Sequence, residues 1–97
     1  MTKADITREV SDMTGLTKIE VDAVLAGMIL TITESLKRGE RVDLRGFGSF
    51  LVKQRAARDA RNPATSEIVR LKERYIPAFK VSKLLKEDVN KSLLRGF

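Results

Sequence analysis

Hydrophobic positions recur at helical spacing through the first forty residues of the chain. A candidate capping box, Thr2 with Asp5, opens a run with apolar residues every three to four positions, which ends near Gly15. A second candidate cap at Thr17 begins a longer run of the same period that reaches Gly39. The apolar surface of this second helix is too wide for one short neighbour to cover, so we expect it to be buried between two subunits. The residues expected in that dimer core are Val24, Leu25, Met28, Ile29 and Ile32.

Beyond Gly39 the period changes from 3.6 residues to two. Residues 42–45 alternate apolar and charged side chains, a Gly-Phe-Gly turn follows at 46–48, and residues 49–53 continue as a second strand. The pattern predicts a β-hairpin with phenylalanines on its core side. We expect the dimer core to include Phe47, Phe50 and Phe79 as well.

The second strand continues past its apolar part as a polar, basic segment. Residues 61–66 have the composition of a turn, and residues 67–74 alternate again, so that Arg70 falls on the face of Ile68 and Leu71 on that of Val69. Too little of this segment is apolar to form a core. The pattern therefore predicts a two-stranded arm over residues 54–75 that projects from the body and is marginally ordered without a ligand.

The chain returns to apolar character after the arm. Residues 75–79 are expected to rejoin the sheet, with Pro77 at an edge or a bulge, and Ser82 to cap a third helix. The fold class is α+β, in one domain over residues 1–97. Its expected parts are a helical dimerisation part at 1–39, a sheet with its arm at 40–80, and a C-terminal helix at 81–94.

Charge and composition point to an acidic partner and away from catalysis. The net charge is +6, and residues 1–50 carry 7 basic and 8 acidic side chains, whereas residues 51–97 carry 12 and 5. Histidine and cysteine are absent and the carboxylates are scattered, so we expect no enzyme, metal site or cofactor. No segment resembles a signal or membrane span, since the longest apolar stretch is residues 24–30. We expect a cytoplasmic protein without a membrane or small-molecule partner.

The arm has the composition of a nucleic-acid-binding ribbon, although it could also be a charged surface hairpin without a ligand. A basic β-ribbon can lie along a groove with its cations on the phosphates, but it can equally be a hairpin kept soluble by its charge. At the tip, Pro63 could be a wedge that enters a base step or an ordinary turn proline. The cations of the arm are Arg55, Arg58, Arg61, Arg70, Lys72 and Arg74.

Four segments in order resemble the HU and integration host factor family of bacterial DNA-bending proteins, over residues 1–91. They are the turn and strand at 46–50, Arg61-Asn62-Pro63 at the tip, Pro77-Ala78-Phe79, and Lys83. Residues 39–50 look closer to the beta-type host factor subunit than to HU. The resemblance implies an intertwined dimer, of two identical chains or with a related subunit, whose arms embrace the minor groove of double-stranded DNA in the nucleoid.

The resemblance also implies roles for individual residues. Pro63 would wedge a base step, with Asn62 assisting at the tip, and the cations of the arm would follow phosphates or the groove floor. The body residues implied in clamping the flanking DNA are Lys3, Lys83 and Lys86. Arg45, with Asp43, would either help select sequence through the groove or form a cross-strand surface pair. The alternative function is a basic RNA-binding module that uses the same arm.

Three residues of the arm depart from the family pattern. Ala60 and Ser66 stand where glycine is usual, and glycine supplies the positive φ angles that a tight tip needs. Ile68 stands where an acid is common. We therefore expect a tip geometry that differs or is strained, on an arm that is more apolar than usual.

Overall fold

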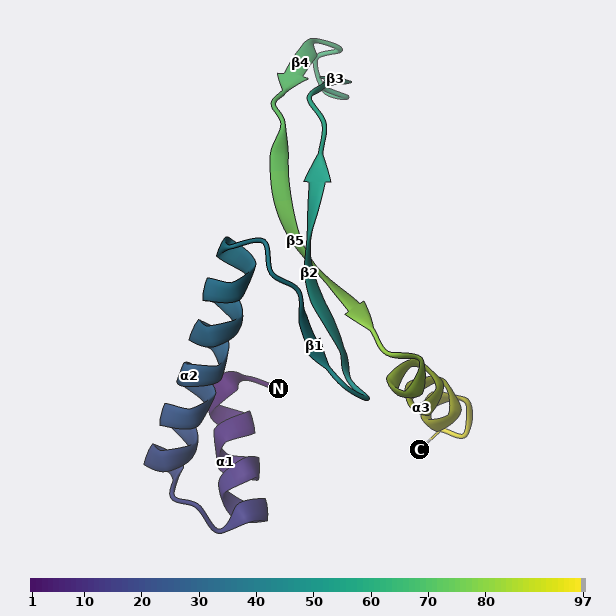
Figure 1. Cartoon of the computed structure of the whole chain (residues 1–97). Coiled ribbons are helices and arrows are strands. Elements are labelled where there is room, and N and C mark those ends of the chain that lie inside the picture. Colours follow the sequence, from purple (N-terminus) through teal and green to yellow (C-terminus); the bar gives the residue numbers. More distant parts are fainter. Residues whose placement is uncertain (97) are drawn as a thin grey trace. The chain divides into compact units, whose positions relative to one another are not determined.

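The computed structural model describes residues 1–96, which divide into two units, residues 1–35 and residues from Leu36 onward. The elements follow the order that the sequence predicts (Figure 1). They are helices α1 (Lys3–Thr14) and α2 (Lys18–Lys37), strands β1 (Val42–Leu44), β2 (Gly48–Arg55), β3 (Arg58–Arg61), β4 (Ile68–Leu71) and β5 (Arg74–Val81), and helix α3 (Lys83–Leu94).

Both predicted caps of the first unit are confirmed. The Asp5 amide donates to the Thr2 hydroxyl at 3.3 Å, and the Thr2 amide donates to the Asp5 carboxylate at 2.8 Å. Thr17 and Glu20 form the same reciprocal pair before α2, at 3.1 Å each way. Helix α1 ends at Gly15, whose φ of 80° is the left-handed conformation that glycine adopts without strain.

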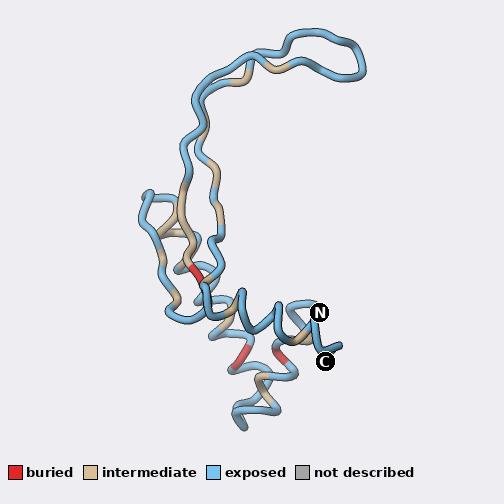
Figure 2. Tube along the Cα trace, turned by 90° about the vertical axis from the view of Figure 1, so that its right-hand side faces the viewer, coloured by how far each residue is buried: buried red, intermediate tan, exposed pale blue. Residues whose placement is uncertain are grey.

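The single chain buries very little of its apolar surface. Within residues 1–96, Val21 is the one buried hydrophobic side chain, at 4% exposure, and Figure 2 shows almost all of the trace as exposed or intermediate. Val24 is 67% exposed, and Met28 and Ile29 are close to half exposed. No helix of the described residues is long and apolar enough to cross a membrane. Much of the apolar surface of α2 is therefore uncovered within this unit.

The second unit is built on a three-stranded antiparallel sheet in the order β1-β2-β5. Val42, Phe50 and Phe79 lie opposite one another across the three strands and so share one face. The ring of Phe79 lies 4.9 Å from that of Phe50 and 5.3 Å from that of Phe47. Pro77 pairs with Val52 on the edge strand β5, which confirms the predicted edge position.

Gly48 permits this aromatic packing. A Cβ atom on Gly48 would overlap the Phe79 ring and would lie 2.6 Å from the Lys80 carbonyl oxygen. The backbone carbonyl cannot move aside as a flexible side chain could. Only glycine therefore fits where the β1–β2 turn meets β5.

The arm differs from the prediction in one respect. The sequence predicts continuous strands through residues 54–60 and 67–74, but the ladder stops after Arg55 and Arg74 and resumes at Arg58 and Leu71. Residues 56–57 and 72–73 lie outside the strands (Figure 1). Alanine, lysine and glutamate have low β propensity and offer little cross-strand packing, so these residues contribute little to pairing across the break. The predicted face alternation holds within β4 and within β5.

Candidate nucleic-acid interface

The arm tip is a compact turn held by the backbone and side chain of Asn62. The Asn62 amide donates to the Glu67 carbonyl at 2.8 Å, and the Ser66 amide donates to the Asn62 carbonyl at 2.7 Å. The Asn62 side-chain oxygen accepts from the Ala64 amide at 2.9 Å, an Asx turn that spans Pro63. These bonds hold Pro63 at the exposed end of the ribbon.

The backbone strain expected at the tip is confirmed for Ser66. Its φ is 61°, and it is the one non-glycine residue among those described with a positive φ. A side chain in this region crowds its own backbone, which costs about 1 kcal/mol relative to glycine. The serine thus adopts a glycine-type turn at the cost of local strain.

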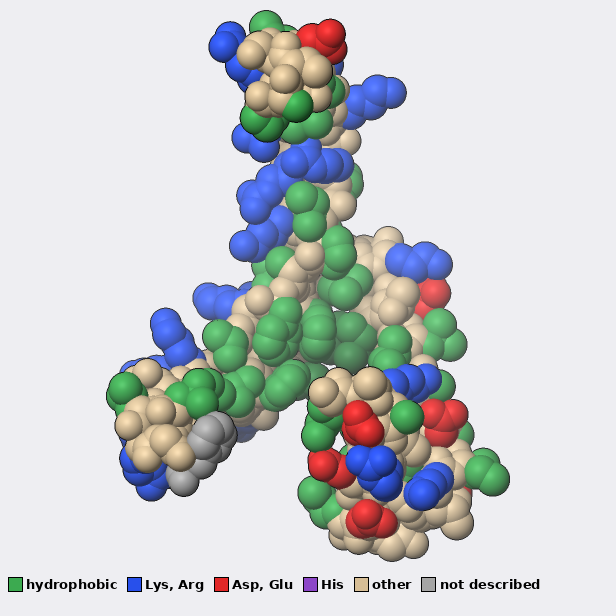
Figure 3. Space-filling model, turned by 180° about the vertical axis from the view of Figure 1, so that it is seen from behind, with side chains coloured by type: hydrophobic (Ala, Val, Ile, Leu, Met, Phe, Trp, Pro, Cys, Tyr) green, Lys and Arg blue, Asp and Glu red, His purple; other side chains and the backbone are tan. Residues whose placement is uncertain are grey.

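Most cations of the arm are unpaired. In the described part of the chain, the side chains of Arg55, Arg58, Arg61 and Lys72 are exposed and have no hydrogen-bond or ion-pair partner. Arg70 differs, because it donates to Asp59 on the opposite strand at 3.2 Å. Figure 3 shows the Lys and Arg side chains gathered along the ribbon. Unpaired, solvated cations in a row form an electrostatic surface for an extended polyanion.

The apolar residue noted on the return strand lies beside the tip. Ile68 pairs with Arg61, immediately before Asn62, and its side chain is 68% exposed. It therefore contributes nothing to a core in this chain. The ribbon end presents apolar surface from Pro63 and Ile68 next to an arginine.

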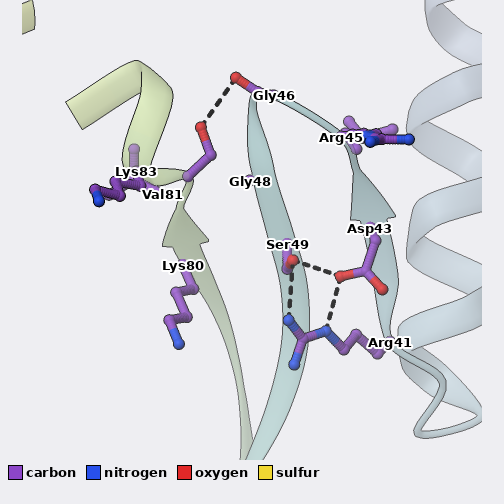
Figure 4. A pocket seen from close by; sticks show the side chains of 11 residues that line it. Arg41, Asp43, Arg45, Gly46, Gly48, Ser49, Lys80, Val81 and Lys83 are labelled. Carbon is purple, nitrogen blue, oxygen red and sulfur yellow. Dashed lines mark hydrogen bonds and ion pairs between the residues drawn. The ribbon is translucent and has the colours of Figure 1, made fainter. Parts of the chain in front are cut away.

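A second basic site lies on the polar face of the sheet. Asp43, Ser49 and Lys80 are opposite one another across β1, β2 and β5. They border an open cavity of about 480 Å³, the sheet cavity, which extends to the start of α3 (Figure 4). Its cations are Arg41, Arg45, Lys80 and Lys83.

The structure thus brings together the predicted DNA contacts Arg45 and Lys83, which lie far apart in the sequence, and adds Arg41 and Lys80. The sequence contained a signal for Arg41, because residues 41, 43 and 45 alternate onto one face of a strand. Lys80 could be placed only once the register of β5 against β2 was known.

Asp43 is bound within the sheet and does not pair with Arg45. Its carboxylate accepts hydrogen bonds from the Ser49 hydroxyl and from the Arg41 Nε atom, the latter at 2.8 Å (Figure 4). The Ser49 bond first, and then Arg41, lower the pKa of Asp43 below its usual value. The expectation of a cross-strand pair of Asp43 with Arg45 is wrong, because the two lie on one segment while Ser49 faces Asp43 across the ladder. Among residues 1–96, Arg45 has no hydrogen-bond or ion-pair partner and can bind an external group.

The other two body residues lie elsewhere. Lys3 belongs to the first unit, where its ammonium lies 3.9 Å from the Asp22 carboxylate. Lys86, on α3, borders a different hollow beside Leu85, Val89 and Leu93. The structure therefore does not bring Lys86 to the sheet cavity. Residues 1–96 contain no group of three acidic, histidine or cysteine side chains able to hold a metal ion.

Comparisons with known proteins agree with this architecture. Residues 1–90 match the family described as bacterial DNA-binding protein. The chain is 38% identical over 91 residues to the DNA-binding protein HU of Clostridium pasteurianum, covering 94% of this chain and all of that protein. It is 40% identical over 98 residues to the integration host factor subunit beta of Marinobacter nauticus, with full coverage of both. Relatives of both kinds thus match at similar identity.

Solved structures resemble the chain as well. An HU protein from Anabaena, crystallised with DNA, superposes with a TM-score of 0.85 at 39% identity, covering 92% of this chain and 97% of that one. HU from Thermotoga maritima gives 0.65 at 31% identity, with 92% and 98% covered. The basic ribbon with a proline at its tip, the sheet beneath it and these matches together assign the chain to the HU and integration host factor family of bacterial DNA-binding, DNA-bending proteins.

Proposed function

We propose that this architectural protein binds double-stranded DNA as a dimer, lays its arms in the minor groove and bends the duplex at Pro63. The observation that carries the proposal is a ribbon whose cations are mostly unpaired within residues 1–96 and which ends in an exposed Asn-Pro turn. The family is not enzymatic, and its Anabaena relative was crystallised with DNA. The expected place of action is the nucleoid.

The dimer is supported by the surface that one chain leaves uncovered. Val24, Met28 and Ile29 on α2 are exposed, and Leu25 and Ile32 are only half-buried. Phe47 in the β1–β2 turn and Phe79 on β5 are also almost half exposed. A second chain, identical or related, would bury both surfaces, so the helical part at residues 1–39 and the phenylalanine face of the sheet serve dimerisation, while the arm at residues 54–75 serves DNA. We expect a melting temperature that rises with protein concentration, and a concentration-independent value would contradict the dimer.

The wedge follows from the chemistry of the tip. A proline ring is rigid and apolar, and the Asx turn of Asn62 holds it at the end of the ribbon. Insertion into a base step costs a few kcal/mol of unstacking, which is offset by the contacts that a bent duplex can make with the protein. The phosphate contacts are assigned to the cations of the arm and to Arg45 and Lys83 in the sheet cavity. Lys3 and Lys86 are assigned to flanking DNA.

The test measures bending separately from affinity. A duplex of roughly 35 base pairs, sized to a wrapped site, carries a fluorophore at each end. Pro63→Ala should reduce end-to-end approach more than it reduces affinity, whereas Ala64→Ser, at the adjacent tip residue, should bend DNA like the unaltered protein. Equal bending by Pro63→Ala would rule out the wedge.

The RNA-binding alternative is decided with the same protein. A minor-groove wedge should favour bent, nicked or gapped DNA over A-form RNA, whose minor groove is wide and shallow. Equal or tighter binding of double-stranded RNA would show that the arm acts through charge alone.

A further inference from the structure

Two arginines face each other at the base of the arm. Arg55 and Arg74 are opposite on the last rung of the β2–β5 ladder, so their side chains leave the same face of the ribbon. Arg74 is half-buried, and its Nη1 atom is buried without a hydrogen-bond partner among the described residues. Like charges directly opposite on a ladder are destabilising, and a buried guanidinium nitrogen without an acceptor adds a desolvation cost. The pairing of Arg55 with Arg74 is therefore energetically unfavourable when no anion is bound.

The ladder stops immediately beyond this rung. Residues 56–57 and 72–73 leave the ladder, although β3 and β4 pair again in the same register, as Arg58 opposite Leu71 shows. No residue is inserted on either side, so the break is not a bulge. Gln54 donates to the Glu73 carboxylate at this level, and that bond engages the acid next to Arg74. The gap therefore has the register of a continuous ladder but lacks its hydrogen bonds.

The neighbouring charges do not neutralise the rung. Lys53 lies two residues before Arg55 on the same face, and Lys72 lies in the gap. The acids nearest in sequence are Glu73, held by Gln54, and Asp59, paired with Arg70. What the rung lacks is an anion with several acceptor oxygens, and a phosphate diester offers these in the geometry that guanidinium groups bind.

We propose that Arg55 and Arg74 form one phosphate site at the base of the arm, and that its occupation by a DNA phosphate closes the ladder across residues 56–57 and 72–73. The proposal rests on the proposed function, since DNA supplies the phosphate. Without a bound phosphate, repulsion between the two guanidinium groups keeps the gap in the ladder open and β3 and β4 weakly attached to the sheet. With a phosphate bound, both guanidinium groups are attracted to it, so DNA binding and the ordering of the arm stabilise each other.

The free protein tests the repulsion without DNA. Amide hydrogen exchange of β3 and β4 is compared for the unaltered chain, Arg74→Gln and Arg74→Glu. Arg74→Gln should slow exchange several-fold, and Arg74→Glu should slow it further, because a carboxylate opposite Arg55 makes a cross-strand ion pair. Arg58→Gln is the matched control, since it removes an arm cation outside the rung and should leave exchange unchanged. Equal exchange in Arg74→Gln and Arg58→Gln would overturn the proposal.

Addition of duplex DNA tests the phosphate. In the unaltered protein, DNA should protect the amides of residues 56–57 and 72–73, whereas in Arg74→Gln this gain should be largely lost and the salt slope of binding should fall by up to about one unit per altered chain of the dimer. Full protection in Arg74→Gln would overturn the shared site while leaving DNA binding intact. If the unaltered protein did not bind DNA, both the proposed function and the phosphate site would be refuted. The exchange rates of the free arm would still show whether Arg55 and Arg74 repel each other.

Discussion

The Ser82 hydroxyl donates a hydrogen bond to the Gly46 carbonyl at 2.9 Å, across 36 residues of sequence. The same oxygen accepts from the Leu85 amide at 3.1 Å, and the Ser82 amide donates to the Phe47 carbonyl at 2.9 Å. One serine thus caps α3 and attaches it to the β1–β2 turn. This attachment fixes Lys83 at the rim of the sheet cavity.

Replacement of Ser82 should loosen α3. Ser82→Ala removes the cap and the bond to Gly46, so we expect a loss of about 0.5–2 kcal/mol in the free energy of unfolding, measured by denaturant at fixed protein concentration. Ser82→Thr keeps the hydroxyl and should retain most of the stability. An unchanged stability in Ser82→Ala would mean that water replaces both bonds without loss.

The tip should become more ordered when its strained residue becomes glycine. Ser66→Gly removes the crowding at a φ of 61°, and we expect the exchange of the Ser66-Glu67 amides to slow by several-fold, a gain of up to about 1 kcal/mol. Ala64→Gly is the control, because Ala64 is outside the positive-φ region and its methyl group makes no hydrogen bond, so glycine there only adds freedom to the unfolded tip. Faster exchange in Ser66→Gly would show that the serine side chain supports the turn.

Asp43 should restrain DNA binding by engaging Arg41. Asp43→Asn removes the ion pair, so Arg41 becomes available to a phosphate, and we expect tighter binding of duplex DNA with a salt slope steeper by about one unit per altered chain of the dimer. Glu40→Gln is matched in charge but lies outside the sheet cavity, and it should change the slope less. Weaker binding by Asp43→Asn would mean that the carboxylate orients Arg41 toward a DNA phosphate. The preference of both proteins for particular DNA sequences would then be compared on a panel of duplexes.

Acid should weaken the helical unit through its capping boxes. Bonds from Thr2 lower the pKa of Asp5, and bonds from Thr17 lower the pKa of Glu20. A carboxylate with a lowered folded-state pKa stabilises the fold above its unfolded-state pKa, and this contribution disappears as the pH falls through the folded-state pKa. Stability should therefore decline from about pH 4 downward.

The pH effect has a direct control on the same helix. Asp5→Asn should flatten part of the decline seen in unfolding titrations, whereas Asp12→Asn, which removes a carboxylate that caps no helix, should retain it. Parallel curves for the unaltered chain and Asp5→Asn would contradict a role for this cap.

Local signals predicted most of the fold. Thr2 with Asp5, Gly15, Thr17 and Ser82 mark helix ends, because each satisfies backbone groups within a few residues of itself. The change of period after Gly39 located the sheet, and Pro77 indicated an edge because proline cannot donate to a ladder. Each of these features depends only on residues close together in the chain, so it can be read from the sequence.

The sequence by itself determined the order of the elements, the basic arm and the tip with Pro63, since periodicity, charge and turn chemistry are local. Tertiary structure decided that the arm breaks at residues 56–57 and 72–73 and that Arg55 faces Arg74. It also decided that Asp43 binds Ser49 and that Lys80 joins Arg45 at one cavity. The physical reason is register: which side chains meet across a ladder depends on how strands far apart in sequence align, and a shift of one residue would place each on the opposite face.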